Sequence, residues 1–293
     1  MPQDAQAELV LDAKAALGEG SLWHAEKSVL YWVDIMGDAL HIYDPATRRD
    51  RAIPVGQNVG TVVPRRKGGV MLAVQHGFAS LDLETEKLAI IADPEAHLKT
   101  RMNDGKCDPA GRFWAGTLAY SFETGGGNVY CLDTDLSVRL MIPRVTVSNG
   151  IVWSLDEKTM YYIDTRTRQV EAFDYDKATG AISNRRVAVE IPEGQGSPDG
   201  MTGDAEGNLW IAHWGGWRVS RWDPRSGKHL ATVHVPAAHV TSCAFGGRDL
   251  GDLYITTARS GLNEEALAQQ PSAGGLFHYR SAVKGVRAFE FLG

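Results

Sequence analysis

The chain alternates short strands of hydrophobic and polar residues with turns of Asp, Gly and Asn, and this pattern recurs along its length. In residues 199–212, an Asp-Gly pair precedes a short apolar segment, an Asp/Gly turn and a strand that carries an aromatic residue. The same order of features occurs in residues 103–116 and 149–164. Strands of period two that reverse at such turns are predicted to form β-hairpins. The recurrence indicates an all-β protein built from repeats.

Six such units follow one another, with a spacing of about 40–50 residues, which is the length of a four-stranded propeller blade. The units cover residues 18–45, 59–82, 103–133, 149–176, 199–224 and 241–279. Several units close with an Asp-containing turn, of which Asp223–Gly227 is one example, and these residue types favour turns. We therefore predict a six-bladed β-propeller. No linker divides the chain, so residues 1–293 are expected to form one domain.

Two segments outside the repeats also have the pattern of strands. They are Glu8–Leu11 before the first unit and Val286–Phe291 after the last one. Both are expected to help close the ring, because closure removes exposed strand edges. Residues 260–271 interrupt the pattern, and Asn263 could cap a short helical turn there.

The first polar residue of a unit is expected to face the axis, because each propeller blade turns its innermost strand toward the central channel. In four units this residue is Glu19, Asn103, Asn149 or Asp199. Two carboxylates and two amides form an all-oxygen set, which suits a hard divalent cation. Without a cation, two close carboxylates would repel each other and one would have to stay protonated. Each residue alone could be an ordinary turn former beside Gly, but their common position in four repeats favours a shared site.

The composition of the chain excludes several classes of function. The net charge of −6 is spread along the chain without a basic stripe, so nucleic acid is not an expected partner. No apolar run approaches the ~18 residues of a membrane span, and residues 1–7 lack the apolar core of a signal peptide. The three cysteines, Cys107, Cys131 and Cys243, are far apart without a C-x-x-C pair, and we interpret them as reduced buried residues. A cytoplasmic protein is expected.

Several catalytic motifs are absent from the sequence. The Gly-x-Ser-x-Gly elbow of serine hydrolases does not occur. Neither do the His-Glu-x-x-His motif, a phosphate-binding loop or a Gly-x-Gly-x-x-Gly turn. The chemistry is therefore expected to depend on the oxygen-rich channel. His213 and His239 could line the propeller mouth, although a histidine beside a strand can equally be packed or solvated.

The sequence resembles the regucalcin (senescence marker protein)/gluconolactonase family over essentially its whole length. The stretches that carry this resemblance are Arg101–Lys106, Asp108–Arg112, Ser148–Gly150, Trp153–Asp156, Phe173–Asp176, Ile182–Arg186, Pro198–Met201, Thr241–Cys243, Phe245–Gly247, Gln270–Pro271 and Ala273–Gly275. The resemblance implies a six-bladed propeller, in agreement with the repeats. It also implies a lactonase, an enzyme of carbohydrate metabolism that hydrolyses aldonolactones with one divalent cation.

The resemblance also implies roles for individual residues. The family's metal ligands match Glu19, Asn149 and Asp199, and its substrate-contacting Arg and Asn match Arg101 and Asn103. Animal members have a substrate-contacting Glu after a Gly-Thr-Met-Ala stretch. Here Gly116–Ala119 is followed by Tyr120, which we expect to bind substrate; the resemblance therefore implies the reaction class but not the exact sugar. Ca²⁺ is the first expectation for the cation, and Zn²⁺, Mn²⁺ or Mg²⁺ are alternatives.

In this interpretation the cation polarises the lactone carbonyl and stabilises its developing negative charge. Asp199 is the candidate general base that takes a proton from the attacking water. Its role as a metal ligand would lower its basicity, so the two roles compete. The alternatives are a metal-dependent esterase of the paraoxonase or phosphotriesterase type, and a calcium-binding regulatory protein. A small sugar lactone is the expected partner, with the protein as a monomer or weak homo-oligomer.

Overall fold

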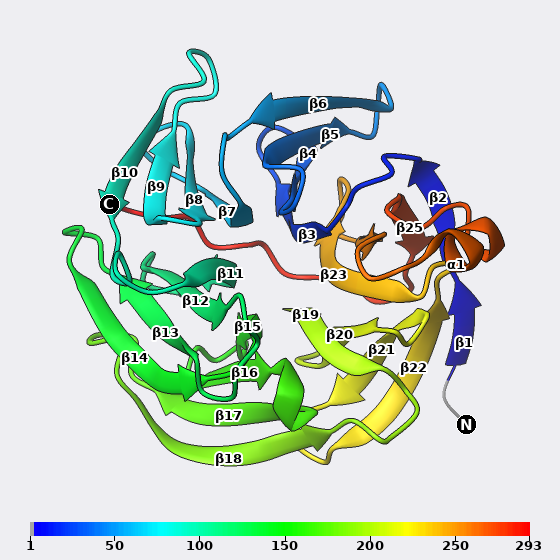
Figure 1. Cartoon of the computed structure of the whole chain (residues 1–293). Helices are drawn as coiled ribbons and strands as arrows, with labels where there is room; N and C mark the ends of the chain where they lie inside the picture. Colours follow the sequence, from blue (N-terminus) through cyan, green and yellow to red (C-terminus); the bar gives the residue numbers. More distant parts are fainter. Residues whose placement is uncertain (1–2) are drawn as a thin grey trace.

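Six sheets surround a central axis in the computed structural model, which describes residues 3–293 (Figure 1). The first blade consists of β3 (Gly18–His24), β4 (Val29–Asp34), β5 (Ala39–Asp44) and β6 (Arg49–Pro54). The second consists of β7 (Val59–Pro64), β8 (Val70–Val74), β9 (Gly77–Leu81) and β10 (Leu88–Ala92). The third consists of β11 (Thr100–Cys107), β12 (Phe113–Ala119), β13 (Gly127–Leu132) and β14 (Val138–Val145).

The fourth blade consists of β15 (Ser148–Trp153), β16 (Thr159–Asp164), β17 (Gln169–Tyr175) and β18 (Ile182–Glu190). The fifth consists of β19 (Ser197–Gly203), β20 (Leu209–Trp214), β21 (Arg218–Asp223) and β22 (Lys228–His234). The sixth contains β23 (His239–Gly246), β24 (Asp252–Ala258) and β25 (Leu276–Arg280). The prediction of a six-bladed β-propeller is confirmed, with the blades at the predicted places in the chain.

The start of the chain completes two blades. Strand β2 (Glu8–Leu11) pairs antiparallel with β25 and becomes the outer strand of the sixth blade. This confirms the prediction that Glu8–Leu11 helps to close the ring. Strand β1 (Gln3–Gln6), which the sequence pattern did not reveal, pairs parallel with β22 at the edge of the fifth blade. Neighbouring blades are thus joined through the first residues of the chain, and two outer edges are covered.

The prediction of a strand at Val286–Phe291 is wrong. This segment crosses the ring from the fifth blade toward the second, and Figure 1 shows it in red across the centre. It forms isolated bridges at its two ends, between Gly285 and Asp204 and between Phe291 and Arg65. It has the composition of a strand but crosses the blades instead of running along one, so it has no neighbouring strand with which to form a ladder. We call residues 285–293 the C-terminal strap.

The packed interior lies between the blades, as the aromatic strands predict. Trp32, Trp114, Trp153 and Trp210 are all buried, and the three cysteines are buried and free, as expected. The irregular segment after β24 contains α1 (Glu264–Gln269), whose N-terminus is capped by the Asn263 side chain. None of the helices in residues 3–293 is long and apolar enough to cross a membrane.

A β-bulge interrupts each inner strand near its start. Register shifts occur between Glu19 and Leu22 in β3, between Ser148 and Ile151 in β15, and between Pro198 and Met201 in β19. Strand β11 has a similar shift after Met102. A bulge bends a strand and changes the direction of its side chains, and bulges often occur next to active sites. Glu19, Asn103, Asn149 and Asp199 lie at these bulges.

Candidate active site

The polar residues predicted to face the axis do come together. Glu19, Asn103, Asn149 and Asp199 lie near the starts of β3, β11, β15 and β19, and none of them is more than 5% exposed. Gly150 allows two of these strands to approach closely, because a Cβ atom there would lie only 2.8 Å from the Asp199 carbonyl oxygen. The four side chains therefore share one buried region at the end of the channel where the inner strands begin.

The Glu19 and Asp199 carboxyls are close enough for each to change the pKa of the other. Burial and the nearby Asp104 raise the pKa of Glu19 to about 8, although the Gly20 N–H donates to its Oε2 atom at 2.8 Å. Burial and the Glu19 charge hold the pKa of Asp199 well above its usual range. These shifts follow from the cost of placing two negative charges together out of water. The raised pKa values favour a pair that shares a proton when no cation neutralises it.

The two amides are held in fixed orientations. Asn103 Nδ2 donates to the Ser148 carbonyl oxygen at 2.7 Å and to Asn149 Oδ1 at 3.2 Å. Asn149 Nδ2 in turn donates to Thr165 Oγ1 at 2.7 Å, and the Thr165 hydroxyl donates to the Pro198 carbonyl oxygen at 2.9 Å. Thr165 belongs to the turn after β16 and was not among the predicted site residues. This network fixes Asn149 with its oxygen on the Asn103 side.

Arg101 lies beside the amides. It is buried, and its Nη1 atom donates to Asn103 Oδ1 at 2.7 Å and to the Met102 carbonyl oxygen at 3.0 Å. Burial lowers the pKa of the guanidinium, while Glu19 and Asp199 are among the groups that raise it. A buried cation thus partly balances the buried carboxylates and also holds Asn103 in place.

Tyr120 is not part of the buried cluster. It follows β12, is 44% exposed, and its hydroxyl donates to Asn58 Oδ1 at 2.9 Å. Burial raises the pKa of Tyr120, and the nearby Arg101 charge lowers it. Tyr120 therefore stands at the rim of the site, within electrostatic range of Arg101.

Asp104 is a third buried carboxyl that sequence reasoning missed. Its burial raises its own pKa, which Lys106 and the Gly105 N–H lower in part, and its charge raises the pKa of both Glu19 and Asp199. The sequence contains a signal for it, because Asp104 also precedes a Gly. It was missed because one inward residue per strand was expected, whereas the bulge in β11 buries two consecutive polar residues.

The donor set suits a divalent cation of the hard type. No group of three or more His, Cys, Asp and Glu side chains that could hold a metal exists in the part of the chain the structure describes. The cluster instead combines two carboxyls, Glu19 and Asp199, with the amide of Asn149. Oxygen ligands of this mixed kind fit Ca²⁺, Mg²⁺ or Mn²⁺, and a cation would neutralise the buried carboxyl pair.

The sequence did not decide whether His213 and His239 line the channel, and in the structure the two have different surroundings. His213 is fully buried, and its ring contacts the Gln195 carbonyl oxygen and the Ser220 hydroxyl. His239 stacks on Trp214 with ring centroids 3.9 Å apart, and its Nδ1 atom lies 3.0 Å from the Ser260 carbonyl oxygen. His213 is therefore a packed residue, and His239 forms part of an aromatic wall.

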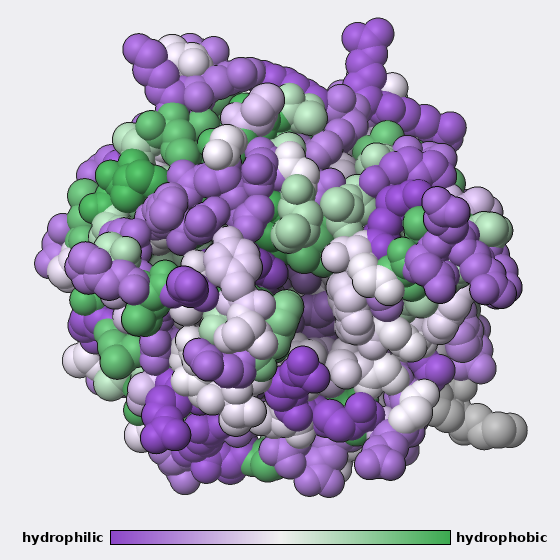
Figure 2. All heavy atoms as spheres, in the orientation of Figure 1, coloured by the Kyte–Doolittle hydropathy of each residue, from purple (hydrophilic) through white to green (hydrophobic). Residues whose placement is uncertain are grey.

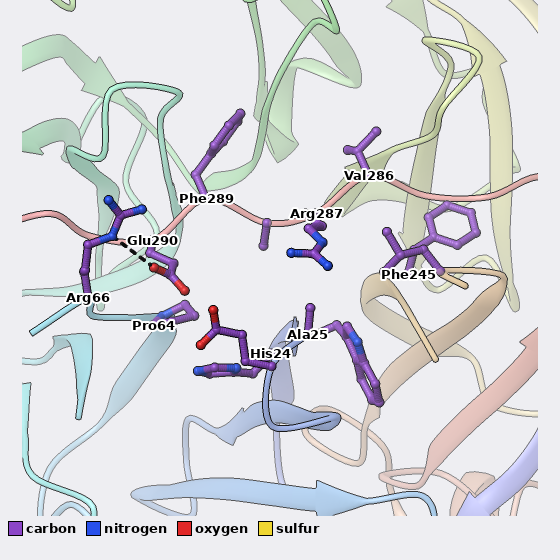
Figure 3. A pocket seen from close by; sticks show the side chains of 13 residues that line it. His24, Ala25, Pro64, Arg66, Phe245, Val286, Arg287, Phe289 and Glu290 are labelled. Atoms are coloured by element: carbon purple, nitrogen blue, oxygen red, sulfur yellow. Dashed lines mark ion pairs between the residues drawn. The ribbon is translucent and has the colours of Figure 1, made fainter. Parts of the chain in front are cut away.

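The opposite end of the channel is closed by the C-terminal strap. A cavity of about 240 Å³ lies under the strap, between Arg287, Glu290 and the turn at His24–Glu26, and Figure 3 shows Arg66 paired with Glu290 at its edge. A smaller cavity of about 60 Å³ extends to Lys106. These cavities are separate from the Glu19–Asp199 pair. Figure 2 shows a hollow with hydrophilic residues near the centre of the visible face.

Comparison with known proteins gives consistent results. A sequence model of the SMP-30/gluconolactonase/LRE-like region matches residues 17–259. The chain is 42% identical to regucalcin of Danio rerio, over 98% of this chain and 99% of that protein. It is 40% identical to the putative sugar lactone lactonase YvrE of Bacillus subtilis (strain 168), over the same shares. The crystal structure of a calcium-binding protein, regucalcin, from Agrobacterium tumefaciens superposes with a TM-score of 0.95 at 27% identity, covering 99% of each chain.

Proposed function

Because this chain belongs to the SMP-30/gluconolactonase/LRE-like family, we propose that it is a metal-dependent hydrolase that opens the ester ring of aldonolactones. The observation that carries this proposal is the buried pair of Glu19 and Asp199, with the amide of Asn149 beside it. The pair is costly to ionise without a cation. It is also next to polar groups that could hold a hydroxylated substrate.

Glu19, Asn149 and Asp199 are the residues that would hold the cation. Ca²⁺ is our first candidate because a similar protein is described as calcium-binding, and Zn²⁺, Mn²⁺ and Mg²⁺ are alternatives. When bound, a divalent cation supplies Lewis acidity toward the lactone carbonyl and favours the negative charge that develops there. Three protein ligands leave room for substrate and water.

Asp199 is our candidate for the general base. Burial and the neighbouring carboxyls raise its pKa and favour its protonated form, and a bound cation would favour the ionised form that can accept a proton, although it would lower the basicity of that form. In the proposed step, Asp199 takes a proton from water while the water oxygen attacks the carbonyl carbon. The bond between that carbon and the ring oxygen then breaks, and the proton passes to the ring oxygen. The product is an open-chain hydroxy acid.

Arg101 and Asn103 are proposed to bind the sugar hydroxyls. The two bonds that Arg101 makes within the protein both use Nη1, so the rest of its planar guanidinium can donate to substrate. Asn103 is held by bonds at both ends of its amide, which limits its motion. Preorganised polar groups restrict the substrate to few orientations, and their polarity favours a hydroxylated lactone over an apolar ester.

A calcium-binding regulatory role is the second candidate, and the description of the regucalcin from A. tumefaciens as calcium-binding favours it. The two candidates differ in whether substrate is turned over. A metal-dependent esterase of the paraoxonase type would instead act on apolar esters or lactones. The same panel of substrates separates all three.

The test is a pH-indicator assay of protein stripped by chelator, with and without each cation restored. The panel contains glucono-, galactono-, xylono- and arabinono-lactones and one apolar lactone. Cation-dependent acid release from the sugar lactones supports the proposal, whereas activity on the apolar lactone alone supports an esterase. Tight cation binding without any turnover supports the regulatory role. Asp176→Asn is the control for variants of the site carboxyls, because Asp176 lies in an exposed turn away from the channel. Its activity should equal that of the native protein.

A further inference from the structure

Three loops at the rim of the site are joined by a chain of hydrogen bonds. Asp38 comes from the turn between β4 and β5, Asn58 precedes β7, and Tyr120 follows β12. Asn58 Nδ2 lies 2.8 Å from Asp38 Oδ1, and Asn58 Oδ1 lies 2.9 Å from the Tyr120 hydroxyl oxygen. The first three blades thus contribute one side chain each to a connected group.

The partners of Asn58 determine which way its amide points. Nδ2 contacts two groups that can only accept a hydrogen bond, the Ile35 carbonyl oxygen at 3.1 Å and the Asp38 carboxylate at 2.8 Å. An amide NH₂ supplies two donors, and an amide oxygen supplies none. The reversed amide would place its oxygen against both acceptors, so the hydrogen-bond network assigns the orientation. Asn58 Oδ1 therefore faces Tyr120.

This orientation determines the direction of the next bond. Because Asn58 Oδ1 can only accept, the Tyr120 hydroxyl must donate its one proton to it. The Tyr120 oxygen then has only lone pairs left for any other partner. A free tyrosine hydroxyl can donate or accept, whereas this one is restricted to accepting.

We propose that Tyr120 is a specificity-determining residue that accepts a hydrogen bond from a hydroxyl of the lactone, and that Asn58 is the positioning residue that sets this polarity. The inference rests on the proposed lactonase function. Arg101, on the neighbouring strand β11, can only donate. The rim of the site therefore has a donor, Arg101, and an acceptor, the Tyr120 hydroxyl oxygen. It selects lactones that carry a free hydroxyl at the position next to Tyr120.

Position and exposure support contact with substrate. The Tyr120 N–H donates to the Lys99 carbonyl oxygen at 3.1 Å, which fixes Tyr120 just beyond the last paired residues of β11 and β12. Its side chain is 44% exposed, although its hydroxyl is tied to Asn58. A rim residue that is held in place by hydrogen bonds but is partly exposed to solvent is suited to contact a ligand and to discriminate between ligands.

The test uses a series of aldonolactones in which one hydroxyl at a time is removed or converted to a methyl ether. The native protein should lose about tenfold in kcat/KM when one particular hydroxyl is changed in either way, as expected for a lost hydrogen bond at a partly buried site. Tyr120→Phe should lose a similar factor on the parent lactone through a higher KM. On the lactone that lacks this hydroxyl, Tyr120→Phe should have the same kcat/KM as the native protein.

Asn58→Leu tests the polarity. This change frees the Tyr120 hydroxyl to turn and donate, so the methyl ether should be discriminated against several-fold less than in the native protein. A merely structural role of Asn58 would lower activity on all compounds equally and would overturn the polarity assignment. Binding of 1,5-anhydroglucitol, a ring without the reactive carbonyl, is measured by calorimetry as a readout independent of turnover. Tyr279→Phe, on β25, is the matched control and should change neither readout.

The outcomes separate this inference from the proposed function. Hydrolysis by the native protein with an unchanged substrate profile in Tyr120→Phe would overturn the inference and leave the lactonase proposal standing. Failure of the native protein to hydrolyse any lactone would overturn both. Loss of the same single-hydroxyl preference in Tyr120→Phe, together with weaker binding of 1,5-anhydroglucitol, supports it.

Discussion

The carboxyls of Glu19 and Asp199 come from the inner strands of two different blades, and in their shared buried site each changes the pKa of the other. Neither carboxyl can ionise there at ordinary cost while the other is charged. The stability of the metal-free protein should therefore depend on pH, and cation binding should depend on the release of protons.

We expect the melting temperature of the metal-free protein to fall as pH rises. The pKa of Glu19 is raised from 4.5 to about 8 in the folded protein, so between these values the folded state binds more protons than the unfolded state. Stability from this group is complete below about pH 4.5 and is lost as pH rises through about 8. Calorimetry in chelator from pH 5 to 9 measures the effect, and added cation should flatten it.

Glu19→Gln is the control for this pH dependence, because an amide cannot titrate. Its melting temperature should vary less between pH 5 and 9 than that of the native protein. A native profile that rises over the same range in chelator would contradict the assignment.

Asp199→Ala and Asn103→Ala should have different kinetic effects. Asp199→Ala removes both the candidate base and a metal ligand, so we expect turnover to be abolished and cation affinity to fall. Asn103→Ala removes a group that orients the substrate, so KM should rise with a smaller change in kcat. Steady-state kinetics and cation titration by calorimetry measure both. Turnover retained by Asp199→Ala at saturating cation would refute the role of Asp199.

Asp104→Asn should weaken cation binding although Asp104 is not among the predicted ligands. Its negative charge raises the pKa of both Glu19 and Asp199, so it adds to the negative potential at the site. Removing one buried charge at close range should reduce divalent cation affinity by about tenfold, since Coulomb interactions are strong out of water. The pH dependence of cation binding should also move to lower pH. Equal affinity in Asp104→Asn and native protein would exclude this electrostatic role.

Gly285→Ala should destabilise the protein without affecting the cation site. A Cβ atom at Gly285 would lie 2.1 Å from Phe245 Cβ, where the C-terminal strap meets the sixth blade. Overpacking of this kind costs about 1–3 kcal/mol. Denaturant unfolding measures the loss, and calorimetric titration should give an unchanged cation affinity. Val286→Ala, at an exposed position of the strap, is the control that should cost little.

The blades could be predicted from sequence because each one repeats the same local pattern. Glu19 and Asp199 were found because they begin inner strands, and the symmetry of the ring brings such positions together. Asp104 was missed because a bulge breaks the alternation on which the pattern depends. The C-terminal strap was assigned as a strand because its apolar residues resemble one. Its path across the ring is set by contacts with distant segments, which a local pattern does not contain.

Asn58 shows the same limit at the rim. No motif marks it, and its importance follows only from three partners, Ile35, Asp38 and Tyr120, that the fold places around it. Sequence reasoning identified Tyr120 because it replaces a different residue type in the family. The polarity of its hydroxyl could be deduced only from the orientation of the Asn58 amide.

The pairing of β2 with β25 has a consequence for the order in which the molecule folds. Glu8–Leu11 is synthesised before all six inner strands, but its partner strand is Leu276–Arg280, which follows them. The N-terminal strand must therefore stay without its partner throughout synthesis, while the intervening blades form one after another. Closure of such a distant contact is slow. The sixth blade, which holds the two ends together, is expected to be the last to assemble and the first to open under mechanical or thermal stress.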